Sequence, residues 1–159
     1  MSLRTLKIKN LDLDMIRPSK KNMDDVVLGG SKIVVIGKPS TGKSFLIRDL
    51  MYRKSSVFPT CMVMNGTEGF THAYEKFGVP TSMIYDGLHK DRLESFIERQ
   101  KLAREHLSNP WALLVIDDCM DDPKLWNDPV FGALIKNGRQ MAMTMIIGLQ
   151  YCMDIKPTI

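Results

Sequence analysis

Four short apolar runs, separated by segments of mixed polarity, dominate the hydrophobic pattern of the chain. They are SKIVVIG (residues 31–37), CMVMNG (61–66), ALLVIDD (112–118) and MTMIIGLQ (143–150). Runs this short without polar alternation are typical of strands that are buried on both faces of a sheet. TSMIYDG (81–87) predicts a further short extended segment, and residues 3–13, which alternate roughly with a period of two, predict another strand.

Three of the intervening segments predict helices. Residues 43–53 offer apolar side chains for packing on one side, residues 67–78 predict a short helix that Gly78 ends, and residues 90–107 carry apolar side chains at helical spacing. Strands that alternate with helices favour an α/β fold with a mostly parallel sheet.

The segment GKPSTGKS (37–44) joins the first apolar run to the first predicted helix and fits the phosphate-loop pattern G-x-x-x-x-G-K-[ST]. Gly37 lets the chain turn sharply, and Gly42 lets backbone N–H groups approach a phosphate. We predict that Lys43 reaches the β and γ phosphates of ATP and that the Ser44 hydroxyl binds Mg²⁺. The predicted nucleotide-binding residues are Gly37, Lys38, Pro39, Ser40, Thr41, Gly42, Lys43, Ser44 and Phe45.

The apolar run 112–118 ends in two carboxylates, as the second half of such a site requires. We predict that Asp117 holds Mg²⁺ through water and that Asp118 orients and deprotonates the attacking water. The alternative for Asp118 is a surface carboxylate or a helix cap. A small-molecule kinase must keep water away from its phosphate, so the acidic pair favours an ATPase. The Asn-Lys-x-Asp tetrapeptide of signalling GTPases does not occur in the sequence.

Two residues further along the chain are candidates for the same reaction. Gln150 ends the fourth apolar run, at the edge of the sheet where the phosphate loop should lie, and would sense the γ-phosphate or the water. Arg139 follows a predicted helix and a glycine, and would reach the nucleotide of a neighbouring subunit. The alternatives are a strand-end amide for Gln150 and an ion pair or helix-end cation for Arg139.

Composition narrows the class of protein. The 159 residues carry a formal net charge of +4, with 44% hydrophobic and 25% charged residues, as in a globular domain. Residues 1–60 hold 12 Lys/Arg and 5 Asp/Glu, a net of +7, whereas residues 61–159 have a net of −3. A basic first part is compatible with a polyanionic partner or with an ordinary lysine-rich surface.

The remaining features exclude several other classes. The three cysteines (Cys61, Cys119 and Cys152) are widely spaced, and the three histidines show no metal-ligand spacing, so we expect reduced thiols and no zinc site. The longest apolar runs fall far below the ~18 residues of a spanning helix. The N-terminus is not that of a secretory signal. These features predict a cytosol-like compartment without direct membrane insertion.

Several segments resemble the genome-packaging ATPases of large nucleocytoplasmic DNA viruses, which are poxvirus-like members of the FtsK–HerA group of P-loop NTPases. The segments are GKPSTGKSFLIRDLMY, MNGTEGFTHAYEKFGVPTSMIYD, ERQ, LLVIDDCMDDPKLWNDPVFGALIKNGRQ and IIGLQYCMDIKP, and the resemblance extends from about residue 5 to the last residue. Matched by position, the family's phosphate-loop lysine is Lys43, its acidic pair is Asp117 and Asp118, its arginine is Arg139 and its strand-end glutamine is Gln150.

The resemblance implies an ATP-driven homo-oligomeric ring that pulls double-stranded DNA into a capsid. It further implies sequence-independent DNA contacts, viral capsid proteins as partners, and action at assembly sites in the host cytoplasm and in the virion. The family often has His where this chain has Gln140, and Gly where it has Pro39 or Ser40. The chemistry of the loop does not depend on those positions.

The resemblance also predicts how the chain is organised. We expect a single P-loop ATPase domain over 1–159, with an N-terminal strand and connector (1–27) and a RecA-like three-layer core (28–159) that lacks a C-terminal strand. Within the sheet, the phosphate-loop strand should neighbour strand 143–150, followed by 112–118 and then 61–66. The other side of the phosphate-loop strand should be open or covered by the N-terminal segment. Two other functions stay open: a nucleoside or nucleotide kinase, and a non-catalytic ATP-dependent assembly module.

Overall fold

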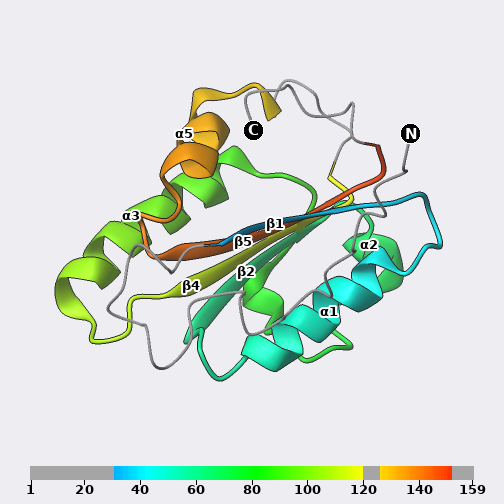
Figure 1. The fold of residues 1–159 in the computed structure, drawn as a ribbon, viewed down its shortest axis with the longest axis horizontal. Helices are drawn as coiled ribbons and strands as arrows, with labels where there is room; N and C mark the ends of the chain where they lie inside the picture. Colours follow the sequence, from blue (N-terminus) through cyan, green and yellow to red (C-terminus); the bar gives the residue numbers. More distant parts are fainter. Residues whose placement is uncertain (1–30, 120–125, 152–159) are drawn as a thin grey trace, which may run out of the picture.

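The computed structural model describes residues 31–119 and 126–151, which form one parallel sheet with helices on both faces (Figure 1). The sheet has five strands in the order β1-β5-β4-β2-β3, and each neighbouring pair is parallel. The strands are β1 (Lys32–Ile36), β2 (Thr60–Asn65), β3 (Ile84–Asp86), β4 (Ala112–Asp117) and β5 (Met143–Leu149). The predicted α/β class and strand order are therefore confirmed, with β3 added beyond β2. The strand predicted for residues 3–13 lies outside the described residues.

The helices cover the two faces of the sheet separately. Helices α1 (Lys43–Lys54) and α2 (Glu68–Thr71) lie on one face, and α3 (Lys90–His106) and α5 (Pro129–Asn137) lie on the other (Figure 1). A short 3₁₀ helix, η3 (Thr81–Met83), leads into β3. Helix α5 begins where Asp128 accepts a hydrogen bond from the N–H of Val130 and Pro129 occupies the first turn, a common start for a helix.

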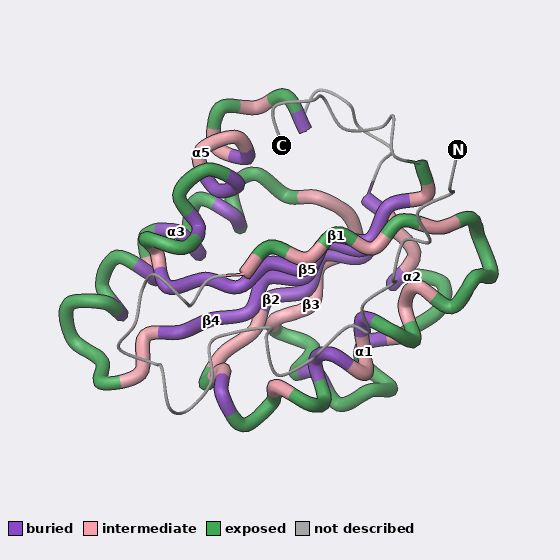
Figure 2. The backbone as a smooth tube through the Cα atoms, viewed as in Figure 1, coloured by how far each residue is buried: buried purple, intermediate pink, exposed green. Residues whose placement is uncertain are grey.

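The two central strands hold the hydrophobic core. Every residue of β4 and β5 is buried, and both strands run through the middle of the sheet (Figure 2). Successive side chains of a strand point to opposite faces. Leu114 and Ile116 accordingly pack with the α3 and α5 side, whereas Leu113 and Val115 pack with the α1 side. The core clusters on the two faces of the sheet therefore both contain side chains of β4.

The phosphate-loop strand is less buried than its sequence predicts. Ile33 and Val35 pack against the α1 side, but Val34 and Ile36 remain 43% and 52% exposed. Within the described part of the chain, β1 is an edge strand, and the core cluster beneath α3 and α5 contains no β1 residue. The burial on both faces that the apolar pattern predicts was therefore wrong for β1, because an apolar run does not report which strand lies at the edge. The predicted strand order, which sets β1 beside β5 alone, agrees with the edge position.

The helix predicted over 67–78 is also wrong in its extent. Helix α2 ends at Thr71, and His72 adopts a left-handed backbone conformation with φ 48°. The carboxylate of Glu68 accepts hydrogen bonds from the N–H groups of Tyr74 and Glu75, which a continued helix would have paired with carbonyl groups one turn earlier. A side chain thus competes with the helix and folds residues 72–78 into turns.

We expect Gln100→Leu to destabilise the fold. The Gln100 side chain is fully buried, and its Nε2 donates to the carbonyl oxygens of Pro110 and Met141 at 2.9 and 3.0 Å. Leucine leaves these acceptors unsatisfied, at a cost of about 1–3 kcal/mol in the free energy of unfolding. Urea denaturation measures the loss. The control Lys101→Ala removes only an exposed ion pair with Glu98 and should change the free energy by less than about 0.5 kcal/mol. Equal effects of the two substitutions would contradict the structural role of Gln100.

Candidate nucleotide-binding site

The candidate site lies at the edge of the sheet where the parallel strands end. The chain leaves β1 at Gly37, whose N–H donates to the carbonyl oxygen of Leu149 at the end of β5 (3.1 Å). The loop then turns through two left-handed residues, Ser40 (φ 62°) and Gly42 (φ 87°), before α1 begins. A substituent on Gly42 would meet no other atom within 4 Å, so glycine is needed there for its backbone conformation rather than for space.

The start of α1 is suited to an anion. No side chain caps the helix at Gly42, and the first turn holds no acidic residue. The N–H groups and positive dipole end of the helix therefore face the loop without a side-chain partner of their own. The amino group of Lys43 bends over the loop and donates to the carbonyl oxygen of Lys38 at 3.1 Å. Phe45 is 74% exposed, with the Arg48 guanidinium 4.4 Å from the centre of its ring.

A hydrogen bond joins the phosphate loop to the acidic strand. Ser44 Oγ donates to Asp117 Oδ2 at 2.8 Å, although the two residues are 73 positions apart. Asp117 is only 1% exposed, and its other oxygen, Oδ1, has no hydrogen-bond partner among the described residues. A buried carboxylate beside a serine hydroxyl supplies the oxygen ligands that Mg²⁺ prefers, so these two residues would fit a Mg²⁺ ion.

The second carboxylate lies beside the predicted glutamine. Asp118 follows β4 in a left-handed conformation (φ 53°) and is only partly buried, so water can reach it. Gln150 Nε2 donates to Asp118 Oδ1 at 2.5 Å. The structure thus brings together five of the predicted residues at one edge of the sheet, namely Lys43, Ser44, Asp117, Asp118 and Gln150.

Two glycines that the sequence analysis passed over lie against the acidic pair. A Cβ on Gly148 of β5 would lie 2.2 Å from Asp117 Oδ1, and a Cβ on Gly66 would lie 2.1 Å from the carbonyl oxygen of Asp118. Neither glycine has a positive φ, so space rather than conformation requires them. The available signal was a glycine within or just after an apolar run, which often marks a close approach by another group.

Arg139 lies elsewhere. It is exposed and belongs to the connection between α5 and β5, at the edge where the strands begin. The seven residues of β5 separate it from Gln150, a span of roughly 20 Å at the usual rise of a strand. Arg139 lines a pocket of about 250 Å³ with Lys32, Lys136 and Gln140. The structure does not bring Arg139 to the nucleotide site of its own chain.

Sequence reasoning also missed three buried polar residues behind Asp117. Asn65 is the last residue of β2 and is paired in register with Asp117. Its side chain donates to Glu68, and the hydroxyl group of Tyr74 donates to Asp117 Oδ2 at 2.9 Å. Burial, and secondarily the charge of Asp117, raise the pKa of Tyr74, so its hydroxyl stays protonated and acts as a donor.

The amino-acid sequence is similar to proteins of large DNA viruses. Protein 088R of Invertebrate iridescent virus 3 is 48% identical over 155 residues, which cover 98% of this chain and 59% of that protein. Protein 075L of Invertebrate iridescent virus 6 is 44% identical over 153 residues, which cover 96% of this chain and 58% of that protein. The chain therefore spans less than two thirds of the length of these relatives. No protein-family model matches it.

The fold is similar to those of a genome packaging NTPase and of a conjugation coupling protein. The genome packaging NTPase B204 of Sulfolobus turreted icosahedral virus 2, solved with AMP, superposes with a TM-score of 0.56 and 18% identity over 81% of this chain and 69% of that chain. The pCW3 conjugation coupling protein TcpA, solved with ATPgS, superposes with a TM-score of 0.50 and 20% identity over 76% of this chain and 43% of that chain.

The fold is that of a P-loop NTPase. The resemblance seen in the sequence is confirmed at the level of the fold, because the structural neighbours include a viral genome packaging NTPase and the sequence relatives are proteins of large DNA viruses. Within the described ranges, no helix is both long enough and apolar enough to cross a membrane.

We expect Gly148→Ala to destabilise the P-loop NTPase fold and to disturb Asp117. The added methyl group would collide with Asp117 Oδ1 and lie 3.0 Å from Ile47, so overpacking should cost about 1–3 kcal/mol of the free energy of unfolding. Gly132→Ala is the matched control, because Gly132 lies within α5 and its Cβ would meet nothing within 4 Å. That change should stabilise the helix by about 0.5–1 kcal/mol. Thermal and urea unfolding distinguish the two, and a harmless Gly148→Ala would contradict the close packing.

Proposed function

We propose that the chain is the ATPase domain of a motor that uses ATP and Mg²⁺ to move double-stranded DNA during viral genome packaging. Residues 28–159 form the ATPase core of this domain. The observation that carries the proposal is the 2.8 Å hydrogen bond from Ser44 to Asp117, which joins the phosphate loop to the acidic strand. The contact between Asp118 and Gln150 lies at the same edge of the sheet. Together they form a site suited to hydrolysis.

Each residue of the site has a distinct role in this mechanism. The loop amides and Lys43 hold the phosphates, while Ser44 and Asp117 hold Mg²⁺. When bound, Mg²⁺ neutralises part of the charge that develops on the transferred phosphoryl group. Asp118, which water can reach, accepts the proton of the attacking water molecule. The side-chain amide of Gln150 donates a hydrogen bond to the Asp118 carboxylate and so keeps this carboxylate in place.

The position of Arg139 supports a role between subunits. It lies at the opposite edge of the sheet from the phosphate loop of its own chain. A ring that places this edge against the next subunit's nucleotide would let Arg139 neutralise the transition-state charge there. Such arginines are worth about 10³–10⁵ in rate. Lys32 and Lys136, which line the same pocket, would add positive charge to that interface.

The proposed substrate is duplex DNA gripped independently of its sequence. This rests on the neighbours' own descriptions as a DNA-packaging ATPase and a conjugation coupling protein, and on the viral origin of the relatives. We propose viral capsid proteins as partners, and assembly sites in the host cytoplasm and the virion as places of action. A motor that moves any genome needs contacts to phosphates rather than to base edges.

We expect the 159-residue chain to hydrolyse ATP faster with long duplex DNA than without it. Lys43→Ala should abolish turnover. Asp118→Asn should lower turnover by about 10²–10⁴-fold while ATP binding persists, because it removes the proton acceptor but not the phosphate contacts. A coupled phosphate-release assay measures turnover, and a fluorescent ATP analogue measures binding. The control Asp49→Asn changes an exposed carboxylate on α1 that is paired with Arg53, and it should leave both unchanged.

The other candidate functions make different forecasts in the same assays. Binding without turnover, unaffected by Asp118→Asn, would point to a non-catalytic assembly module. Transfer of the γ-phosphate to a nucleoside or nucleotide, with no effect of DNA, would point to a kinase.

We also expect the affinity for duplex DNA to fall steeply with salt. A protein that contacts six to ten phosphates loses about 10³–10⁵ in affinity between roughly 50 and 200 mM salt. Fluorescence anisotropy with two unrelated duplexes of equal length measures both the slope and the sequence independence. A flat salt dependence, or a preference for one duplex, would rule out a grip on the DNA backbone.

A further inference from the structure

We propose that Tyr74 is a positioning residue that orients the Asp117 carboxylate for Mg²⁺, and that Glu68 holds Tyr74 in place. The inference rests on the proposed function, since it assigns a role within the same nucleotide site. Tyr74 lies on neither the phosphate loop nor the acidic strand, and it reaches Asp117 from a turn segment 43 residues earlier in the sequence.

Two hydroxyl groups converge on one carboxylate oxygen. Asp117 Oδ2 accepts from Ser44 Oγ at 2.8 Å and from Tyr74 Oη at 2.9 Å. Because both donors share Oδ2, the carboxylate cannot rotate without losing two charge-assisted hydrogen bonds. The other oxygen lies against Gly148. Tyr74 thus fixes the orientation in which Asp117 presents its carboxylate oxygens to Ser44 and to the metal.

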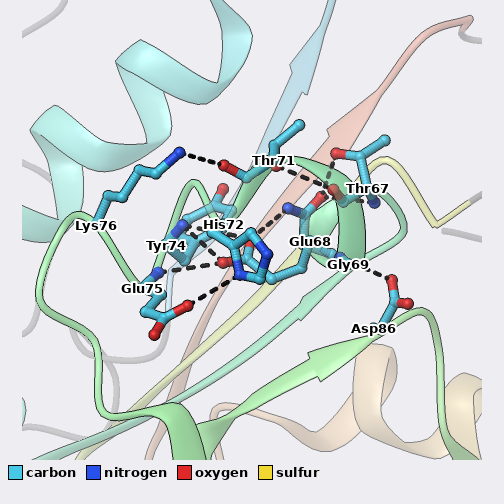
Figure 3. A network of polar contacts seen from close by, with 10 residues as sticks. Thr67, Glu68, Gly69, Thr71, His72, Tyr74, Glu75, Lys76 and Asp86 are labelled. Carbon is cyan, nitrogen blue, oxygen red and sulfur yellow. Dashed lines mark hydrogen bonds and ion pairs between the residues drawn. The ribbon is translucent and has the colours of Figure 1, made fainter.

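Glu68 fixes the backbone from which Tyr74 projects. The Glu68 carboxylate is buried, and its Oε1 accepts the N–H groups of Tyr74 at 3.0 Å and Glu75 at 3.1 Å (Figure 3). Its Oε2 accepts from Asn65 Nδ2 at 2.7 Å. Asn65 lies next to Asp117 in the register of β2 and β4. These hydrogen bonds connect Asn65 at the end of β2, through Glu68 and Tyr74, to Asp117 at the end of β4.

The ring and the hydroxyl of Tyr74 do different things. The ring is fully buried in the core cluster on the α1 side, so it contributes to folding. The hydroxyl reaches past this cluster to Asp117. Phenylalanine keeps the ring and deletes only the hydroxyl, which separates the positioning role from the packing role.

The test compares Tyr74→Phe with Tyr85→Phe. Tyr85 is a matched control, because its hydroxyl donates to the carbonyl oxygen of Ser82 at 3.3 Å in an exposed contact on another segment. For each 159-residue variant, binding of a fluorescent, non-hydrolysable ATP analogue is titrated with Mg²⁺ and repeated in EDTA. Removing a group that orients a metal ligand typically weakens metal affinity about 10–100-fold. Tyr74→Phe should raise the half-saturating Mg²⁺ concentration by about that factor and leave binding in EDTA unchanged. Tyr85→Phe should behave like the wild type in both titrations.

A second variant tests the link through Glu68. Glu68→Gln keeps the shape of the side chain but weakens its hold on the two N–H groups. It should shift the Mg²⁺ dependence in the same direction, and it should add little in the Tyr74→Phe background, because the two residues act on Asp117 in series.

Other outcomes overturn the inference. A purely structural role for Tyr74 would lower nucleotide binding equally with and without Mg²⁺, or lower the unfolding temperature alone. An unchanged Mg²⁺ dependence would also contradict it. A wild-type chain that binds the analogue with Mg²⁺ but hydrolyses no ATP would refute the proposed function alone, since the positioning effect is read from binding. No Mg²⁺-dependent binding by the wild type would refute both.

Discussion

The hydrogen bond between Ser44 and Asp117 is the contact on which the site depends. Ser44 lies in the first turn of α1, after the loop that follows β1, whereas Asp117 ends β4, and β5 lies between β1 and β4. The loop and the start of α1 therefore bring Ser44 to Asp117 over β5, whose two neighbouring strands lie about 10 Å apart. Gly148 of β5 has no side chain at the point where the Asp117 carboxylate lies, and the end of β5 also anchors the loop through Gly37. A glycine in the middle strand makes this contact possible.

The two adjacent carboxylates occupy very different environments. Asp117 is almost completely buried, and an unpaired buried carboxylate is costly. The hydroxyl groups of Ser44 and Tyr74 offset that cost by donating to one oxygen. Asp118 is partly exposed and bonds to the flexible side chain of Gln150. Burial therefore suits Asp117 to a fixed electrostatic role, and exposure suits Asp118 to proton exchange with water.

What the sequence could predict depends on how local each feature is. The strands and the phosphate loop were predictable because apolar runs and the spacing of Gly, Lys and Ser are properties of adjacent residues. The exposure of β1 is not visible in its apolar run, although the strand order that the resemblance implies places β1 at the edge. The early end of α2 depends on where the Glu68 carboxylate points. The contact from Tyr74 to Asp117 joins residues 43 positions apart and leaves no periodic signal. The end of α2 and the contact from Tyr74 follow from tertiary packing, so only the structure could show them.

The separation of Arg139 from the candidate nucleotide site gives the chain two different ends. In the proposed ring, Arg139 at one end of the strands would contact the phosphate loop at the other end of the next subunit. Such a contact is head-to-tail, so it can close into a ring and cannot form a symmetric pair through the same surface. On the proposed role, a subunit that lacks Arg139 would keep its own phosphate loop intact and would silence only the subunit beside it. The loss of activity would then fall on the neighbour of the altered subunit. A subunit that lacks Arg139 and an adjacent subunit that lacks only its phosphate loop could still form one complete site at their interface.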